Sequence, residues 1–205
     1  MSVVTVYDAS GLENWAKAAD LALQGADFTP ALRQCSVAIR GDALQNFQNS
    51  SSPDGQSWPP LKHPRPSSQG ADKPLLDRGI LAGSITGRGQ NNFEELTPHS
   101  LAVGSNLEYA RLQQEGGVVT PKNVKWLTIP VTRKARRTPA RKFPGLFKLK
   151  GKQVLATKKG KGFEAQFILV GSVKIPARAF LGFGPRLAQK IDDILGDFVE
   201  RFQSK

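Results

Sequence analysis

The feature that most limits how this chain can fold is a stretch of 48 residues, 116–163, without a single Asp or Glu. It carries 14 of the 29 Lys and Arg residues, whereas the rest of the chain carries 15 basic and 17 acidic groups. The formal net charge of +12 therefore belongs to this one segment, which is also less apolar than the rest and need not belong to the core. A near-neutral body with one basic appendage indicates that the appendage has a partner of its own, such as a phosphate backbone or an acidic protein face.

The remaining composition is that of a folded protein. The chain has 205 residues, of which 39% are apolar, and its 11 Phe and 3 Trp residues suffice for a core. Cys35 is the only cysteine, so no intrachain disulfide is possible. A four-Cys or Cys/His zinc site is excluded too, because only His63 and His99 could join Cys35. Residues 1–9 do not read as a signal peptide, and no run approaches the roughly 18 apolar residues of a membrane span. We expect no membrane partner, and either a soluble intracellular product or one that leaves its cell without a signal.

The first quarter of the chain has strong helix signals. A short strand is expected at 3–7, and Ser10 with Glu13 fits a capping box for a helix that Gly25 ends. A second helix is expected from Thr29-Pro30, with Thr29 as its N-cap, and we expect it to pack on a sheet. Its apolar stripe consists of Leu32, Cys35, Ile39, Ala43 and Phe47, widened by Val37 and Leu44.

The middle of the chain is dominated by turn signals. Residues 49–74 are expected to form an irregular exposed loop, with a turn at Pro53-Asp54-Gly55 and with Trp58 anchoring the loop to the body. A helical turn is predicted over 75–81, a strand near 84–86, a strand at 101–104 and a short helix over 109–114 that ends at Gly116-Gly117.

The basic segment has strand-like pieces at 124–129, 147–149 and 154–156, and Gly151-Lys152 suits a type II′ hairpin turn. Residues 133–144 lack an apolar period and are expected to be mobile, and a basic turn is expected at 158–162. A buried strand is predicted over 165–170. Pro185 opens a C-terminal helix with one apolar face, formed by Leu187, Ile191, Leu195, Phe198 and Phe202.

The patterns that carry catalytic chemistry are missing. Residues 145–152 resemble a phosphate-binding loop, but five residues separate the glycines where four are needed, and Gln153 replaces the metal-binding hydroxyl. Glu164-Ala165-Gln166 lacks the Lys of a nuclease motif, and Asp192-Asp193 is expected on the solvent side of a helix. Neither histidine has a Ser or Cys partner, and Cys35 falls on a helix stripe. We therefore expect no enzyme, no cofactor and no metal.

The densest basic residues have two interpretations. They can contact a DNA backbone or an acidic protein surface, or they can form a solvated loop that aids solubility. The absence of acidic residues and the alternation of charged with β-forming residues favour contact. Aromatic residues are sparse in this segment, which disfavours stacking on single strands. The predicted contact residues are Arg133, Lys134, Arg136, Arg137, Arg141 and Lys142.

Several motifs, taken in order, resemble one family. They are Phe47 with Pro53-Asp54-Gly55 and Trp58-Pro59-Pro60-Leu61; the run 75–85; Val103-Gly104-Ser105 with the run 109–117; and the run 175–182, Ile-Pro-Ala-Arg-Ala-Phe-Leu-Gly. This series is similar to the virion morphogenesis proteins, or tail completion proteins, of Mu-like and related tailed phages. The family often has His where Gln113 stands and Pro where Ala179 stands.

The resemblance implies an α+β fold, in which an N-terminal and a C-terminal helix pack a small, mainly antiparallel sheet. It implies a single domain over 1–205, and residues 118–163 then form a basic β-hairpin or loop insertion within it. Trp58, Arg178, Phe180 and Leu181 are the candidate subunit-interface residues, although the Arg178 segment can equally be an internal strand-to-helix joint.

The implied function is structural. The protein would complete the tail or join it to the head as a homo-oligomeric ring, with six subunits expected, and would be found in the tail or neck of virions assembled in the host cytoplasm. Its expected partners are itself and neighbouring head–tail connector and tail tube proteins, and packaged DNA in the channel is a further candidate. The alternative is a non-specific duplex-DNA-binding module that uses the basic segment, and a nuclease with an unrecognised motif is a third possibility.

Overall fold

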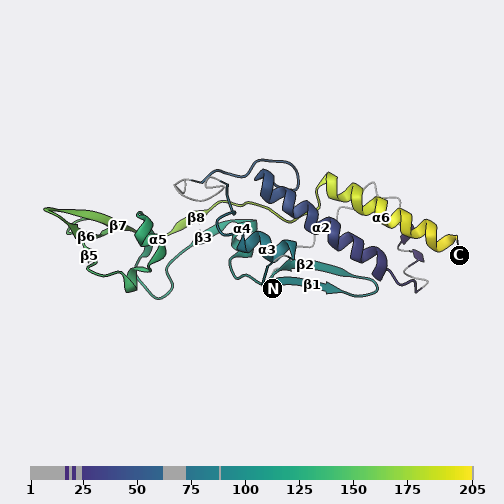
Figure 1. The fold of residues 1–205 in the computed structure, drawn as a ribbon, viewed down its shortest axis with the longest axis horizontal. Helices are drawn as coiled ribbons and strands as arrows, with labels where there is room; N and C mark the ends of the chain where they lie inside the picture. Colours follow the sequence, from purple (N-terminus) through teal and green to yellow (C-terminus); the bar gives the residue numbers. More distant parts are fainter. Residues whose placement is uncertain (1–16, 19, 22–24, 62–72, 88, 205) are drawn as a thin grey trace. The chain divides into compact units, whose positions relative to one another are not determined.

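The computed structural model describes residues 17–18, 20–21, 25–61, 73–87 and 89–204 (Figure 1). The strand predicted at 3–7 and the capping box at Ser10 lie outside these residues. The chain folds into two compact units: residues 1–116 with 176–205 form the first, and residues 117–175 form the second. The predicted basic arm, residues 118–163, falls within the second unit, which we call the β-unit.

In the residues that the structure describes, the first unit consists of helices and a β-hairpin. Its elements are α2 (Thr29–Asn49), α3 (Ile80–Thr86), β1 (Asn92–Leu96), β2 (Leu101–Ser105), α4 (Ala110–Glu115) and α6 (Pro185–Gln203). The two strands pair antiparallel from Asn92↔Ser105 to Leu96↔Leu101. Helices with antiparallel strands confirm the predicted α+β class.

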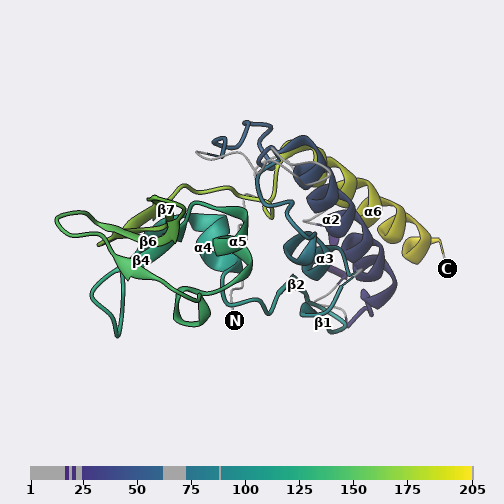
Figure 2. The same ribbon diagram turned by 60° about the vertical axis from the view of Figure 1, so that its left-hand side comes forward.

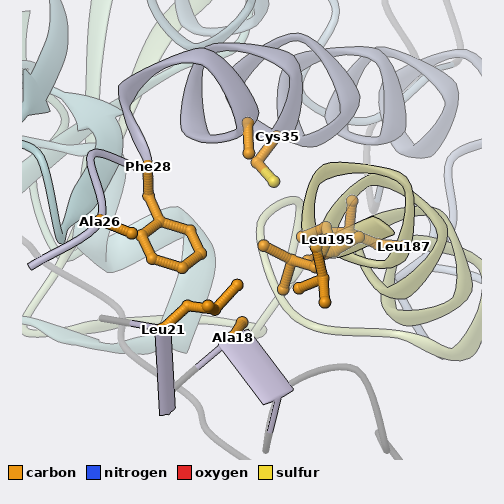
Figure 3. Packing of buried hydrophobic residues seen from close by; sticks show 10 residues of the cluster. Ala18, Leu21, Ala26, Phe28, Cys35, Leu187 and Leu195 are labelled. Atoms are coloured by element: carbon orange, nitrogen blue, oxygen red, sulfur yellow. The ribbon is translucent and has the colours of Figure 1, made fainter. Parts of the chain in front are cut away.

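Helix α2 packs mainly against α6 (Figure 1). Their apolar stripes meet in one core. Figure 3 shows Phe28 and Cys35 from the α2 side facing Leu187 and Leu195 of α6. The helix also contacts β1 and β2, so the prediction that it packs on a sheet is confirmed, while its main partner α6 was not predicted. Val37 does not widen the stripe, because 72% of it is exposed.

The start of α2 also differs from the prediction. Phe28 is its N-cap, and Thr29 and Pro30 are already helical. The Asp27 carboxylate accepts a hydrogen bond from the Thr29 amide at 2.8 Å, so an acidic side chain satisfies the free amide of the first helical residue.

The strand predicted near 84–86 is the end of α3 instead. Leu81, Ala82 and Ile85 are buried at helical spacing in a second core with Phe47 and Trp58. Gly79 and Gly87 flank the helix with φ angles of 71° and 73°, a conformation that suits glycine. Burial of three side chains on one helical face outweighs the β propensity of a short Ile-Thr pair.

The β-unit contains β3 (Gly117–Val119), β4 (Leu127–Pro130), α5 (Arg133–Arg137), the 3-10 turn η1 (Ala140–Lys142), β5 (Phe147–Lys148), β6 (Val154–Lys159), β7 (Gly162–Val170) and β8 (Val173–Ile175). Strands β4-β7-β6-β5 form an antiparallel sheet in that order, and β3 pairs with β8. Figure 2 labels β4, β6 and β7 of the larger sheet. The predicted β5–β6 pair and the basic turn after β6 are confirmed. The turn at Gly151 is not a two-residue type II′ turn: Lys152 donates to Leu149 O at 3.1 Å, which places Gly151 third in a four-residue turn.

Candidate functional site

The β-unit concentrates positive charge on its surface. Residues 117–175 contain 15 Lys and Arg residues and a single acidic residue, Glu164. All of these basic residues are exposed. The first unit holds the other 14 basic and 16 acidic residues, so it is nearly neutral. The charge asymmetry seen in the sequence is therefore a difference between two folded units.

Glu164 does little to offset this charge because its carboxylate is already engaged. Lys159 Nζ lies 2.6 Å from Glu164 Oε1, and Gln166 Nε2 donates to Oε2 at 3.0 Å. The hydrogen bond from Lys159 is the main cause that lowers the pKa of Glu164, so the group is ionised at neutral pH. The only carboxylate of the β-unit is thus already paired with Lys159 in an exposed salt bridge.

Six of the basic residues lie on α5 and η1, which together form a basic cap: Arg133, Lys134, Arg136, Arg137, Arg141 and Lys142. Helix α5 forms because Thr132 is its N-cap, with Oγ1 accepting from Ala135 N at 3.1 Å. The same hydroxyl donates to Gln166, whose amide in turn donates to Thr157 Oγ1 at 3.0 Å. The cap is therefore hydrogen-bonded to the sheet below it.

Apolar contacts hold the cap in place. Ala135 and Phe143 are buried at 3% and 6% exposure, in a cluster with Phe167 of β7. The Phe143 and Phe167 rings meet edge-on with centroids 5.5 Å apart, and Lys134 Nζ lies 5.3 Å from the centroid of the Phe143 ring. Residues 133–144, which were expected to be mobile because they lack an apolar period, form α5 and η1 and are packed through one alanine and one phenylalanine.

The six predicted contact residues are thus brought together on one folded surface. They lie on two consecutive short helical segments, all exposed, while Ala135 and Phe143 turn inward. Such an array is suited to contact phosphates or carboxylates, because guanidinium and ammonium groups on an ordered backbone lose less freedom on binding than those on a flexible loop.

The other predicted site residues converge on a joint in the first unit, where residues 176–184 cross between the loop 50–61 and α4. Arg178 Nε and Nη2 donate to Pro59 O at 2.9 Å and to Pro60 O at 3.2 Å, and burial lowers the pKa of Arg178. Trp58 Nε1 donates to Ala179 O at 2.8 Å. The prediction that Trp58 anchors the loop is confirmed, and Arg178 uses two donors of its planar guanidinium group to bridge two carbonyl groups of that loop.

Phe180 and Leu181 complete the joint. Phe180 is 2% exposed and stacks on Phe47 with ring centroids 5.2 Å apart, and Leu181 is half-buried. Gln114 Oε1 accepts from the amides of Phe180 and Leu181 at 2.9 and 3.2 Å. Its side chain is the bridge that sequence reasoning missed, because nothing in the pattern Gln113-Gln114 distinguishes a structural glutamine from a solvated one.

These four residues therefore hold the first unit together. Trp58 and Arg178 are 6% and 7% exposed, and their described contacts are internal to that unit. This agrees with the interpretation of the segment as an internal joint. A further role at a subunit interface stays a prediction.

Other kinds of site find little support in the described part of the chain. Within it, no group of three or more His, Cys, Asp or Glu side chains is placed to hold a metal ion. No helix among the same residues is long and apolar enough to cross a membrane. Cys35 is buried in the α2–α6 core, and burial raises the pKa of its thiol to about 11.

The fold and the charge distribution describe an α+β protein with a surface array of cations on a separate compact unit. The sequence matches the phage virion morphogenesis family over residues 7–200, and the chain belongs to this family. Its role lies accordingly in the assembly of the phage particle, with which it is associated. No curated protein and no solved structure matches the chain.

Proposed function

We propose that this protein is a non-enzymatic structural component that completes the phage tail or joins the tail to the head, and that it works as a homo-oligomeric ring. Family membership supports the assembly role. The observation that carries the finer proposal is the separation of charge between the two units, with 15 basic residues and one acidic residue in the β-unit.

Charge separation favours a head-to-tail arrangement of subunits. Two β-units placed face to face would bring two strongly positive surfaces together, which is unfavourable at short range. The first unit carries 16 of the 17 acidic residues of the chain. The β-unit of one subunit is therefore better placed against the first unit of a neighbouring subunit than against the neighbour's β-unit. Heterologous contacts of this kind generate closed rings when the rotation between neighbours closes.

The basic cap is proposed to contact either packaged DNA or the acidic face of a neighbouring head–tail connector or tail tube protein. All six cations of the cap are exposed, and they are displayed on an anchored backbone. Phosphate and carboxylate groups both suit such an array.

Complementation of a phage that lacks this gene tests the role of the cap. The cap variant replaces Arg133, Lys134, Arg136 and Arg137 with Gln, and the matched control replaces Lys148, Lys150, Lys152 and Lys161 with Gln, which removes equal charge outside the cap. We expect the cap variant to accumulate separate heads and tails while the control restores infectious particles. Normal particles from the cap variant, or equal loss from both variants, would reject the role of the cap.

The ring itself is tested on the purified chain by native mass spectrometry and negative-stain imaging. Discrete oligomers or ring-shaped particles are expected, and the protein should be present in purified virions. A chain that stays monomeric at high concentration and is missing from virions would overturn the structural role.

The second candidate function is a free duplex-DNA-binding module. It is favoured by the exposed basic residues of the β-unit, which far outnumber the single Glu164. A gel-shift series with a random duplex distinguishes it, since binding through phosphates weakens steeply as salt rises. Tight, salt-sensitive binding by a monomer that never enters virions would favour this function over the first.

A further inference from the structure

The four-stranded sheet of the β-unit has two faces with different chemistry. The basic cap covers one face, where Ala135 and Phe143 lie against Phe167. Residues paired directly across a sheet share a face, and residues two apart on a strand share it as well. Phe167 is opposite Leu155 and Pro130, so these three side chains belong to the capped side.

The other side has an apolar surface, which we call the open face. One row across it is Ile129↔Ile168↔Val154, and a neighbouring row includes Phe147, which is paired with Ala156. Phe163 belongs to the same face, although it lies four residues from Phe167, because the register shift between Leu155 and Ala156 interrupts the alternation along β7. Its ring meets the Phe147 ring edge-on with centroids 5.4 Å apart. The open face is thus Ile129, Phe147, Val154, Phe163 and Ile168.

These side chains are unusually accessible for their type. Phe163 is 60% exposed and Ile168 is 40% exposed, while Ile129, Phe147 and Val154 are half-buried. Residues 117–175 are all described, and within them α5 and η1 are the helical segments, both part of the cap. An apolar group of this kind on a sheet face marks a contact surface more often than a solvated one.

Basic residues border the open face. Lys158 pairs directly with Phe163 and so lies on the same side, and Lys161 follows in the exposed turn between β6 and β7. An apolar centre with a polar, charged rim is the usual anatomy of a protein–protein interface. A phosphate backbone offers nothing to pair with the exposed ring and aliphatic groups, so DNA is a poor occupant of this side.

We propose that the open face docks on an acidic surface of a second virion protein, one that presents apolar side chains within a carboxylate rim. A symmetric pair of β-units is disfavoured because each unit carries 15 basic residues and one acidic residue. The first unit of another copy is close to neutral, with 14 basic and 16 acidic residues, and offers a weaker complement than a strongly acidic neighbour. This inference rests on the proposed assembly role and adds a surface separate from the basic cap.

Site-specific photo-crosslinking in assembled particles tests the docking partner. The full chain carries Phe163→p-benzoylphenylalanine, and the matched control carries Val124→p-benzoylphenylalanine, a position that is 51% exposed elsewhere in the β-unit. Irradiated particles are analysed by mass spectrometry of the crosslinked peptides. We expect the Phe163 probe to form an adduct with one other virion protein, at a peptide with several Asp or Glu residues, and the Val124 probe to form much less of it. Adding Lys158→Glu to the Phe163 probe should lower the adduct yield several-fold.

The alternative outcomes separate the hypotheses. An adduct with a second copy of this chain, an adduct with DNA, or no adduct above the control would each overturn the docking proposal while the protein remains in the particles. Absence of the protein from particles would instead overturn the assembly role, and the docking proposal with it.

A second variant keeps the test independent of the probe. Phe163→Ser with Ile168→Ser removes the centre of the open face at positions that are already partly exposed, and Val124→Ser serves as control. We expect a fall in infectious titre of at least tenfold with unchanged protein levels for the double variant. An unchanged titre would overturn the proposal.

Discussion

Gly184, the residue before α6, provides the sharpest test of how the joint is packed. Its φ of −85° and ψ of 168° are accessible to any residue, so a side chain there meets no backbone strain. A Cβ atom at this position would nevertheless lie 2.1 Å from Pro53 O and 2.6 Å from Pro53 C. Gly184→Ala therefore tests steric packing alone.

The expected loss of stability depends on how far the atoms of Pro53 must move to make room for the new Cβ. The Cβ–O distance has to grow from 2.1 Å to about 3.4 Å before it reaches ordinary contact, and the obstacle is backbone rather than the end of a flexible side chain. Pro53 is held within a turn in which Gly55 N donates to Ser52 O at 2.9 Å and Ser52 N donates to Gln56 O at 2.8 Å. Overpacking usually costs about 1–3 kcal/mol, and we expect Gly184→Ala to lower the free energy of unfolding by about 3 kcal/mol because a closed turn must shift.

Gly41→Ala is the matched control. Gly41 lies inside α2, and a Cβ atom there meets nothing within 4 Å. Alanine is favoured over glycine in a helix interior by about 1 kcal/mol, so this variant should be more stable than the parent.

Urea unfolding followed by far-UV circular dichroism measures both changes. The midpoint should fall for Gly184→Ala and rise for Gly41→Ala, with similar slopes. A Gly184→Ala variant within about 0.5 kcal/mol of the parent, alongside a stabilised Gly41→Ala, would refute the close approach of Pro53 to the start of α6.

Three further predictions concern other contacts. Arg186→Met should lower the free energy of unfolding by about 2–3 kcal/mol, because Arg186 Nε lies 2.6 Å from Oδ1 of Asp42, whose side chain is 4% exposed. Adding Asp42→Asn should recover most of this loss in a double-mutant cycle measured by urea unfolding. Additive losses from the two substitutions would contradict the pairing. Phe143→Ala should lower the stability of the β-unit by about 3–4 kcal/mol and release the basic cap from the sheet. The release should appear as faster hydrogen exchange at the Ala135 amide. Unchanged exchange would show that Phe143 does not anchor the cap. Burial raises the pKa of Cys35 to about 11 from an ordinary value of 9.0, so the thiol ionises at lower pH in the unfolded chain than in the folded one. The free energy of unfolding should therefore fall as pH rises from 9 to 11. Cys35→Ala should remove this part of the pH dependence. If parent and Cys35→Ala show the same pH dependence, this linkage is absent.

Local patterns predicted the elements whose own residues determine them. The apolar spacing of α6 and the turn residues after β6 act over a few positions, and both are confirmed. The strand expected near 84–86 failed because Ile85 was assigned from local β propensity, whereas its burial beside Phe47 favours a helix. The prediction that Val37 widens the apolar stripe of α2 was wrong for a similar reason, because the neighbouring elements decide which side of the stripe is buried.

By itself, the sequence determined the helical stripes, the absence of recognisable catalytic patterns and the separation of basic from near-neutral residues, because composition and short-range periodicity contain that information. Only the tertiary structure decided that residues 133–142 form an anchored cap and that Gln114 bridges the joint, because both depend on side chains from distant positions. It also decided that one face of the β-unit sheet is capped and the other left open. That division depends on strand register and on where α5 packs, which no local pattern encodes.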